Sequence, residues 1–323
     1  MKAIRIESVG GPDVMHIADV ETPTPSAGEM RVRNHAIGVN FIDTYHRSGL
    51  YKIALPGGLG SEAAGVVDAI GEGVTRFAVG DRVAYCTAPI GAYAEAHVMK
   101  ATLGVPLPQA ISFEIAAASL LKGMTARYLL RKTFPVQRQH VVVIYAAAGG
   151  VGQIAVQWAA HLGATVIAIV GSDAKAAIAQ SLGAQHVIVS SRENIPARVR
   201  EITSGEGADV VYDAIGKDTF EGSLDCLKPL GMMVSFGNAS GPPPQLSPLL
   251  LAQKGSLFLT RPTLGHYTRT LDQLDETARD LFSVMESGAV KIAPPKQYAL
   301  ADAAQAHRDL ERRATTGSLV LAP

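Results

Sequence analysis

Two different patterns of hydrophobic and polar positions divide the chain. From Met1 to about Pro108, short β-branched stretches at 30–40 and 65–70 are separated by clusters of Gly, Pro and Asp, as in an irregular, mostly β domain. From about Leu121, helical windows alternate with continuous apolar runs at 141–146, 165–170, 186–189, 209–215 and 232–237. Buried parallel strands have such runs because helices cover both faces of their sheet. The pattern therefore predicts an α/β fold in which a doubly wound parallel sheet follows a mostly β domain.

The same pattern predicts the domain boundaries. We expect the first domain at 1–122 and the parallel-sheet domain at 123–262. The segment 263–323 returns to a mixed pattern and ends in the apolar run "GSLVLAP", which we expect to rejoin the first domain as a strand. No internal repeat interrupts this organisation.

Composition narrows the class of partner. Lys plus Arg and Asp plus Glu both number 29, so no overall field draws the chain to nucleic acid or to an anionic membrane. The two cysteines, Cys86 and Cys226, are far apart in the sequence, which argues against a disulfide framework. The N-terminus lacks the apolar stretch of a signal peptide, and no apolar run reaches the ~20 residues that span a bilayer. These features predict a cytoplasmic protein whose partners are small molecules.

The segment 141–163 has the order of a dinucleotide-binding unit. The apolar strand at 141–145 is followed by Ala147-x-Gly149-x-x-Gly152, a variant of G-x-G-x-x-G with alanine first, and then by an amphipathic helix that ends at Gly163. Gly149 would let the backbone approach a pyrophosphate, and Gly152 would let the helix pack closely on the strand. The first turn of such a helix offers free N–H groups to phosphates. Further strand and helix patterns downstream favour this interpretation over a merely tight turn.

The next strand, 165–170, indicates which dinucleotide binds. Proteins that prefer NAD place a carboxylate near the end of this strand, where it accepts hydrogen bonds from the adenosine ribose. Here Ser172 and Lys175 follow instead, a hydroxyl donor and a countercharge for a 2′-phosphate. Asp173 is an unfavourable neighbour for that phosphate. We therefore predict a preference for NADPH rather than exclusive use of it.

Several segments together carry a family resemblance. They include "NFIDTYHRSGLY", "GSEAAGVVDAIGEGVTRFAVGDRV", "LLKGMTARYLLRKT" and "AAAGGVGQIAVQW", with further matches at 211–227, 234–241 and 254–264. The chain resembles, from end to end, the NADPH:quinone oxidoreductases, the zeta-crystallin-like branch of the zinc-free medium-chain dehydrogenases/reductases. The resemblance implies a GroES-like β domain for the substrate, a Rossmann domain for NADPH and a cleft between them. It also implies a homodimer built through the Rossmann sheets.

The resemblance also implies roles for individual residues. It places Asn40, Asp43 and Thr125 near the nicotinamide ribose, and Gly149, Gly150 and Val151 at the pyrophosphate. It assigns Gly171, Ser172 and Lys175 to the 2′-phosphate, and Gly237, Asn238, Arg261 and Arg313 to the far wall of the nucleotide site. Family members commonly have a tyrosine near the adenosine phosphate where this chain has Ser190. We expect the loss of that ring to lower the affinity for NADPH or to admit NADH.

A zinc site is not predicted. Catalytic zinc needs three protein ligands, and structural zinc usually has a closed set of four. Zinc-dependent relatives carry Gly-His-Glu where this chain has Gly60-Ser61-Glu62, and a cysteine where it has Asn40. His35, His46 and His97 are scattered, and we interpret them as surface or hydrogen-bonded core residues. Without a Lewis acid, alcohol oxidation is disfavoured.

Quinone reduction is the chemistry that these features favour. A quinone needs little electrophilic help from the protein because the reduced ring delocalises the arriving charge. Tyr45 and Tyr51 are the candidate catalytic residues, as a stacking surface and a phenolic donor for the quinone, although both would also serve simply to pack their loop. An NADPH-dependent enoyl or alkenal reductase is the alternative enzyme. An NADPH-responsive RNA-binding or crystallin-like structural protein is the alternative from another class, and the balanced charge gives nucleic-acid binding little support.

Overall fold

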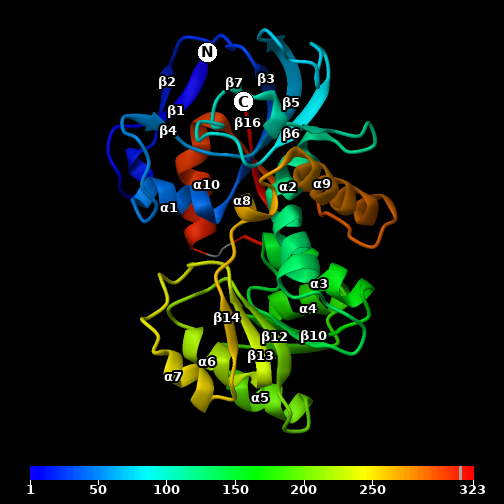
Figure 1. The fold of residues 1–323 in the computed structure, drawn as a ribbon. Coiled ribbons are helices and arrows are strands. Elements are labelled where there is room, and N and C mark those ends of the chain that lie inside the picture. The colour runs from blue at the N-terminus through cyan, green and yellow to red at the C-terminus, as the bar shows by residue number, and fades with distance from the viewer. Residues whose placement is uncertain (313–314) are drawn as a thin grey trace. The chain divides into compact units, whose positions relative to one another are not determined.

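The computed structural model describes residues 1–312 and 315–323, and they group into two compact units (Figure 1). The first unit contains Met1–Lys122, Thr270–Ala278 and Ile292–Pro323. The second contains Gly123–Arg269 and Arg279–Lys291. Two helices contribute residues to both units, α2 (Phe113–Tyr128) and α9 (Leu271–Glu286). Among the described residues, no helix is both long enough and apolar enough to cross a membrane.

A seven-stranded sheet forms the centre of the first unit in the described part of the chain. Its strand order is β15-β16-β3-β5-β6-β8, and β7 also pairs with β3. The C-terminal strand β16 runs antiparallel to β3, with Leu319 opposite Val39, so the end of the chain is a strand of this sheet. The bounds are β3 (Glu29–Val39), β5 (Ala63–Ile70), β6 (Arg82–Tyr85), β7 (Ala96–Lys100), β8 (Val105–Pro106), β15 (Lys296–Ala299) and β16 (Leu319–Ala322).

Among the described residues, a smaller sheet and two α-helices lie wholly within the first unit. The strands β1 (Lys2–Ile6), β2 (His16–Asp19) and β4 (Gly57–Gly58) pair in the order β2-β1-β4. Helix α1 (Phe41–Ser48) follows β3 directly, and α10 (Ala303–Glu311) contacts α1. Apolar side chains that alternate along the strands fill the core between these elements, including Ile4, Met30, Ile37, Tyr85 and Leu321.

The second unit is built on a parallel sheet of six strands among the described residues. Their order is β11-β10-β9-β12-β13-β14, and every neighbouring pair is parallel. The bounds are β9 (Val141–Ile144), β10 (Thr165–Val170), β11 (His186–Val189), β12 (Ala208–Asp213), β13 (Leu227–Ser235) and β14 (Phe258–Thr260). Most side chains of β9, β10 and β12 are buried, as their continuous apolar sequence predicts.

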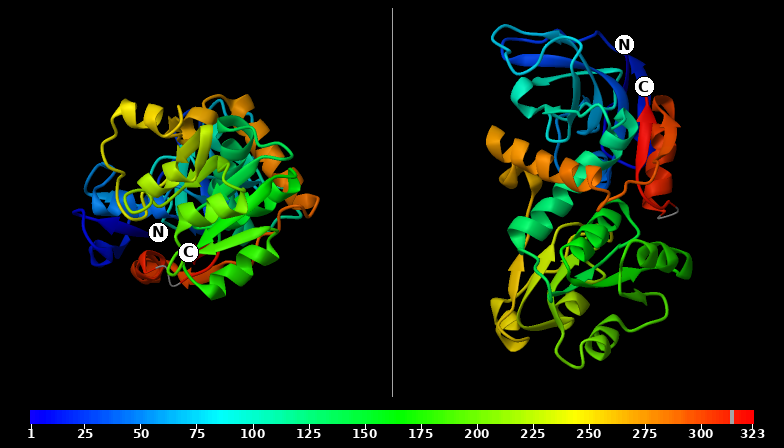
Figure 2. Two further views of the ribbon diagram at one scale, coloured as in Figure 1. Left: turned by 90° about the horizontal axis from the view of Figure 1, so that it is seen from below. Right: turned by 90° about the vertical axis from the view of Figure 1, so that its right-hand side faces the viewer.

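Helices connect consecutive strands of this sheet and cover both of its faces (Figure 1); Figure 2 gives two further views. They are α3 (Gly150–His161), α4 (Asp173–Ser181), α5 (Ile195–Ile202), α6 (Phe220–Asp225) and α7 (Pro248–Gln253), followed by the short α8 (Leu264–Tyr267). The strand order reverses direction between β9 and β12, which is the switch point of a doubly wound sheet. The predicted fold class, a Rossmann sheet with a GroES-like β domain, is confirmed.

Candidate functional site

The predicted nucleotide-binding residues that follow strands of the second unit gather at one edge of its sheet. Gly149, Gly150 and Val151 follow β9, and Gly171, Ser172 and Lys175 follow β10. Ser190 follows β11, Gly237 and Asn238 follow β13, and Arg261 follows β14. Because all six strands are parallel, their carboxyl ends lie at the same edge. Ligands of doubly wound sheets bind at this edge, next to the switch point.

The turn after β9 places a helix N-terminus at that edge. Gly149 is the N-cap of α3 and makes no side-chain cap, so the N–H groups of the first turn have no acceptor within the helix. A Cβ on Gly152 would lie 2.2 Å from the carbonyl oxygen of Ala146, so only glycine lets α3 pack this closely on the turn. This geometry fits a pyrophosphate, because free N–H groups and the helix dipole both favour an anion there.

Three polar side chains surround the start of α4. Ser172 is its N-cap, and its hydroxyl makes no cap hydrogen bond. Lys175 lies in the first turn and is half-buried. Asp173 forms an ion pair with Arg192, with 2.8 Å between its Oδ1 and the arginine Nη2. Arg192 was not predicted, because it follows β11 and only the folded chain brings it to the start of α4. It offsets the negative charge that Asp173 places beside Ser172 and Lys175.

Hydrogen bonds hold the neighbouring loops of this edge in place. Both the backbone N–H and the hydroxyl of Ser190 donate to the carbonyl of Val170, at 2.8 and 3.2 Å, which ties the end of β11 to the end of β10. Arg261 donates from Nη1 to the carbonyl of Ser235 at 3.0 Å and so ties the end of β14 to the end of β13. The fully buried carboxylate of Asp213 accepts four hydrogen bonds, from the N–H groups of Ile215 and Gly216 and the hydroxyls of Thr219 and Ser223.

In the first unit, the predicted residues Asn40 and Asp43 belong to a buried polar cluster. Asn40 caps α1, and its Nδ2 donates to Glu62 Oε2 at 2.7 Å. The backbone N–H of Asn40 donates to Asp43 Oδ2 at 2.8 Å. Glu62 also accepts from the N–H of Leu121 at 2.6 Å and lies 3.6 Å from Nζ of Lys122. Sequence analysis did not identify Lys122, whose ammonium is buried without a hydrogen-bond partner among the described residues.

Burial controls the protonation of this cluster. It raises the pKa of Asp43 to about 7, against the opposing effect of the hydrogen bonds from Asn40 and the hydroxyl of Tyr93. Burial likewise raises the pKa of Glu62, and the nearby Lys122 ammonium opposes that rise. Asp43 has no exposed surface, so its side chain shapes the start of α1 from within the protein.

The two candidate catalytic tyrosines lie against each other. The ring centroids of Tyr45 and Tyr51 are 5.3 Å apart, with an edge-to-face angle of 68°. Tyr45 also lies 6.5 Å from the ring of Phe41 in a tilted arrangement. Both tyrosines are half-buried. They therefore offer one joint aromatic surface. The same contact between the two rings would also form if the tyrosines only packed their loop.

Thr125 and Arg313 are the other two residues predicted to bind the cofactor. Thr125 is half-buried near the C-terminal end of α2, in the second unit. Arg313 lies outside the described residues, and its role stays a prediction.

The histidines of the first unit differ from one another. His35 is exposed and packs on Phe113, with ring centroids 4.5 Å apart. His97 is buried, stacks on Tyr85, and has a pKa that burial lowers to about 4. In the described part of the chain, His97 Nε2 and His46 Nδ1 lack hydrogen-bond partners. The prediction that the core histidines are hydrogen-bonded therefore does not hold for these two nitrogen atoms. Within residues 1–312 and 315–323, no group of three or more His, Cys, Asp or Glu side chains is arranged to hold a metal ion.

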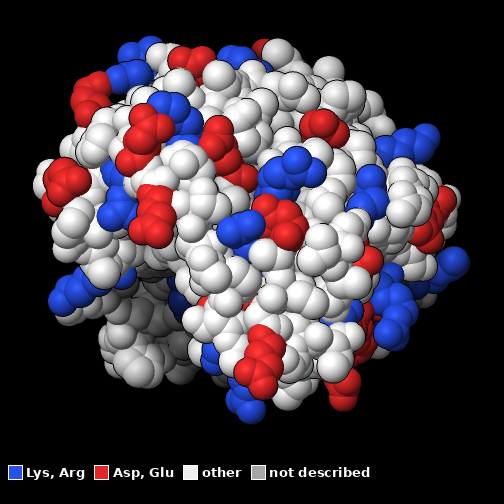
Figure 3. Space-filling model, turned by 90° about the horizontal axis from the view of Figure 1, so that it is seen from above, with Lys and Arg blue, Asp and Glu red and all other residues white. Residues whose placement is uncertain are grey.

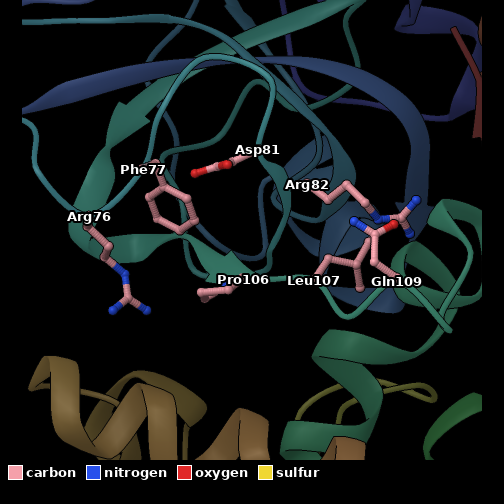
Figure 4. Close-up of a pocket in the computed structure, with 7 residues that line it drawn as sticks. All are labelled: Arg76, Phe77, Asp81, Arg82, Pro106, Leu107 and Gln109. Atoms are coloured by element: carbon pink, nitrogen blue, oxygen red, sulfur yellow. The ribbon is translucent and has the colours of Figure 1, made fainter.

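A hollow of about 270 Å³ lies elsewhere in the first unit (Figure 4). It is lined by Arg76, Phe77, Asp81, Arg82, Pro106, Leu107 and Gln109. The guanidinium of Arg76 is paired with Asp275, and that of Arg82 donates to the carbonyl of Ile111 and lies over the ring of Phe113. Since both cations already have partners, we do not assign a ligand to this hollow.

Comparison with known proteins adds independent evidence. Residues 26–132 match the alcohol dehydrogenase GroES-like domain family, and 150–279 match the family described as zinc-binding dehydrogenase. A quinone oxidoreductase of Pseudomonas aeruginosa is 52% identical over 323 residues, covering 100% of this chain and 99% of the relative. The structure of Escherichia coli quinone oxidoreductase complexed with NADPH is 48% identical, with a TM-score of 0.98 and full coverage of both chains. A 2-haloacrylate reductase of Burkholderia is 44% identical, over 98% of both chains.

Proposed function

This chain belongs to the quinone oxidoreductase family, and we propose that it reduces quinones with NADPH and does so without zinc. The assignment of NADPH as the cofactor rests on the side chains at the carboxyl end of β10. There Ser172 and Lys175 lie at the start of α4, and the carboxylate of the neighbouring Asp173 is paired with Arg192. The related Escherichia coli enzyme, whose structure contains NADPH, matches this chain over its full length.

The residues of the second unit fit the nucleotide. The first turn of α3, with Gly149, Gly150 and Val151, would hold the pyrophosphate by its N–H groups. Gly171, Ser172 and Lys175 would hold the 2′-phosphate, beside Ser190, and Thr125, Gly237, Asn238 and Arg261 would line the remainder of the nucleotide site. A Cβ on Gly237 would lie 2.4 Å from the carbonyl oxygen of Ala214, so the loop after β13 can approach the β12 loop only with glycine there.

The first unit supplies the acceptor side in this proposal. When bound, NADPH supplies the two electrons and one of the hydrogens that the quinone gains, and solvent supplies the remaining proton. Tyr45 and Tyr51 present their joint ring surface to the flat acceptor. Asn40 and Asp43 form the start of α1, which carries Tyr45. That Asn40 and Asp43 lie near the nicotinamide ribose stays a prediction.

The 2-haloacrylate reductase among the relatives favours one alternative, the reduction of an activated carbon–carbon double bond. A steady-state comparison of 1,4-benzoquinone and 2-chloroacrylate, with NADPH as donor, separates the two functions. We expect the quinone to give the higher kcat/KM by at least about tenfold. A higher value for 2-chloroacrylate would assign the chain to double-bond reduction.

A function in nucleic-acid binding has little support. Lys and Arg side chains are interspersed with Asp and Glu on the face drawn in Figure 3, and no single-sign field extends over it. A cytoplasmic location stays a prediction.

We further propose a homodimer formed through the edge strand β14. In the described part of the chain, β14 pairs only with β13, and its Phe258 is 56% exposed. An open edge with an exposed aromatic residue suits pairing with the same edge of a second copy. Light scattering should give twice the 33.9 kDa chain mass, and Phe258→Asp should lower it. Val79→Asp, at a 60% exposed position of the first unit, is the matched control. A monomeric wild type, or equal dissociation in both variants, would contradict this arrangement.

A further inference from the structure

A continuous line of hydrogen bonds crosses the interior of the first unit. Nη1 of Arg47, on α1, lies 3.0 Å from Nδ1 of His307, on α10. Nε2 of His307 lies 3.0 Å from the hydroxyl of Tyr93, and that hydroxyl lies 3.0 Å from Oδ2 of Asp43. The line begins at the surface, where Nη2 of Arg47 pairs with Glu311 at 2.6 Å. It ends at the carboxylate that accepts the N–H of Asn40.

The chemistry of Arg47 fixes which group donates and which accepts in each hydrogen bond of this line. A guanidinium only donates, so Nδ1 of His307 must accept and its proton must be on Nε2. Nε2–H then donates to the oxygen of Tyr93, which leaves the tyrosine proton for Asp43. The pKa of His307 is lowered to about 3 by burial and by the Arg47 cation, which agrees with a neutral ring. Every donor in the line is thus directed toward the Asp43 carboxylate.

The line is buried and closely packed. Arg47 is 3% exposed, and Asp43, Tyr93 and His307 have no exposed surface. Gly60 makes room for the tyrosine, because a Cβ there would lie 2.1 Å from the ring of Tyr93. In the segment Gly60-Ser61-Glu62, the glycine therefore leaves space for the ring of Tyr93, and the glutamate accepts a hydrogen bond from the side chain of Asn40. Two of its three residues support the start of α1.

We propose that Tyr93, His307 and Arg47 are positioning residues for quinone reduction, which hold Asp43 and, through it, the first turn of the helix that carries Tyr45. This inference rests on the proposed function, in which Tyr45 contacts the quinone. The line connects residues separated by 214 and 260 positions in the sequence. No substrate contact by these three residues is required, since they act through Asp43.

Asp43 is faced by the backbone N–H of Asn40 and by three charged or titratable side chains. Glu62 precedes β5, Lys122 lies on α2 and Tyr93 lies before β7. Glu62 raises the pKa of Asp43, whereas Lys122 and the Tyr93 hydroxyl lower it. His307 faces Arg47 and Tyr93. Removing the Tyr93 hydroxyl therefore raises the pKa of Asp43 further above about 7, and a protonated carboxyl is a weaker acceptor for the cap of α1.

The test is the pH dependence of KM for 1,4-benzoquinone in wild type and Tyr93→Phe. We expect the wild-type KM to rise as the pH falls through about 7. In Tyr93→Phe this rise should begin about one pH unit higher, while kcat at high pH stays within about twofold. Tyr298→Phe is the matched control, because it removes a 2.6 Å hydrogen bond from a half-buried tyrosine to Asp309 on α10 without reaching α1. That variant should retain the wild-type profile.

Two substitutions of His307 test the direction of the line. The amide nitrogen of Gln corresponds to Nε2 and keeps a donor for Tyr93, whereas Asn places its amide near Nδ1 and loses that donor. His307→Gln should therefore keep the wild-type profile, and His307→Asn should resemble Tyr93→Phe. Amide hydrogen exchange in the first turn of α1, measured on the folded proteins, should be faster in Tyr93→Phe and His307→Asn than in His307→Gln.

The outcomes separate the inference from the proposed function. A wild type that does not reduce quinones defeats the proposed function, whereas a Tyr45→Ala variant with unchanged KM removes Tyr45 from the quinone site and overturns the positioning role that depends on it. An active wild type and an impaired Tyr45→Ala, together with a Tyr93→Phe profile that superimposes on the wild type, overturn the positioning role alone. Equal exchange rates and equal profiles in the two His307 variants overturn it as well.

Discussion

Arg192 pairs with Asp173 across the start of α4, with 2.8 Å between Nη2 and Oδ1. The two residues come from different loops, after β11 and after β10. The pair explains how an acidic residue is tolerated beside Ser172 and Lys175, where we place the 2′-phosphate. Both side chains are exposed, at 58% and 74%, so their mutual attraction is screened by solvent.

The pair gives the first prediction. Arg192→Ala leaves Asp173 unneutralised and should raise the KM for NADPH by about two- to fivefold, as expected for exposed charges. Asp173→Asn should lower that KM, and the double variant should lie near the wild type. Steady-state kinetics of the four proteins with NADPH and with NADH give a double-mutant cycle for the pair. If both cofactors respond equally in all three variants, the pair does not face the 2′-phosphate.

The joint ring surface of Tyr45 and Tyr51 gives the second prediction. Tyr→Phe at either position keeps the edge-to-face contact and should be mild, because quinone reduction needs little acid assistance. Tyr→Ala should raise the KM for quinone, and since the rings contact each other, the two Ala effects should not add. A fall in kcat of ~10²-fold in a Phe variant would instead identify a proton donor. Wild-type kinetics in all four folded variants would place the quinone elsewhere.

The buried ring of His307 gives a prediction for stability. Its pKa is lowered to about 3 by burial and Arg47, whereas in the unfolded chain it is about 6.5. The unfolded state therefore binds the extra proton between these values, and the free energy of unfolding falls as the pH drops through this window. His307→Gln should reduce the slope between about pH 4 and 6 by ~1.4 kcal/mol per pH unit. Urea unfolding at several pH values measures this slope.

Other buried groups with shifted pKa values, among them His97 and Asp43, also make the free energy of unfolding depend on pH. Burial lowers the pKa of His97 to about 4, so His97 contributes a slope of the same sign. Asp43 acts in the opposite sense, because its raised pKa makes its contribution fall as the pH rises toward about 7. Both remain in His307→Gln, so the difference from the wild type reports His307 alone. Identical slopes would mean that His307 does not resist protonation in the folded state.

The Asn40–Glu62 contact gives a prediction about metal. The resemblance places a cysteine of the zinc-dependent branch at the position of Asn40, whose amide here donates to Glu62 at 2.7 Å. We expect the purified protein to contain no stoichiometric zinc and to keep its activity after treatment with a chelator. Elemental analysis together with the quinone assay checks this. One tightly held zinc per chain, with activity lost on its removal, would refute it.

The fold was predictable because the strongest signals are local. The Val/Ile runs of β9, β10 and β12 are continuous, and the order of strand, glycine turn and helix places Gly149 at the carboxyl edge. The residues after the later strands, such as Gly237 and Arg261, were assigned through the family resemblance, and the parallel strands bring them to the same edge. The orientation of Tyr45 toward Tyr51 was not contained in that pattern.

The residues that sequence analysis missed depend on distant segments. Arg192 reaches Asp173 only because β11 lies beside β10, and an exposed arginine has no periodicity that would mark it. Tyr93 and His307 meet across 214 positions, and each alone resembles an ordinary core residue. Lys122 had one available signal, a lysine within the largely apolar sequence of α2, and its 7% exposure became evident only in the structure.

In the proposed function, NADPH that is held by its 2′-phosphate at the carboxyl end of β10 reduces the quinone. The most direct test is the ratio of kcat/KM for NADPH over NADH, with 1,4-benzoquinone as acceptor, in wild type and Lys175→Glu. Loss of a charge-assisted contact is worth ~1.5–3 kcal/mol, so the ratio should fall by about ten- to hundredfold. Arg138→Glu, an exposed charge reversal before β9 at the opposite edge of the sheet, should leave it unchanged. Equal losses for both cofactors in Lys175→Glu would show that Lys175 does not hold the 2′-phosphate, and a wild type that does not reduce quinones would refute the proposed function.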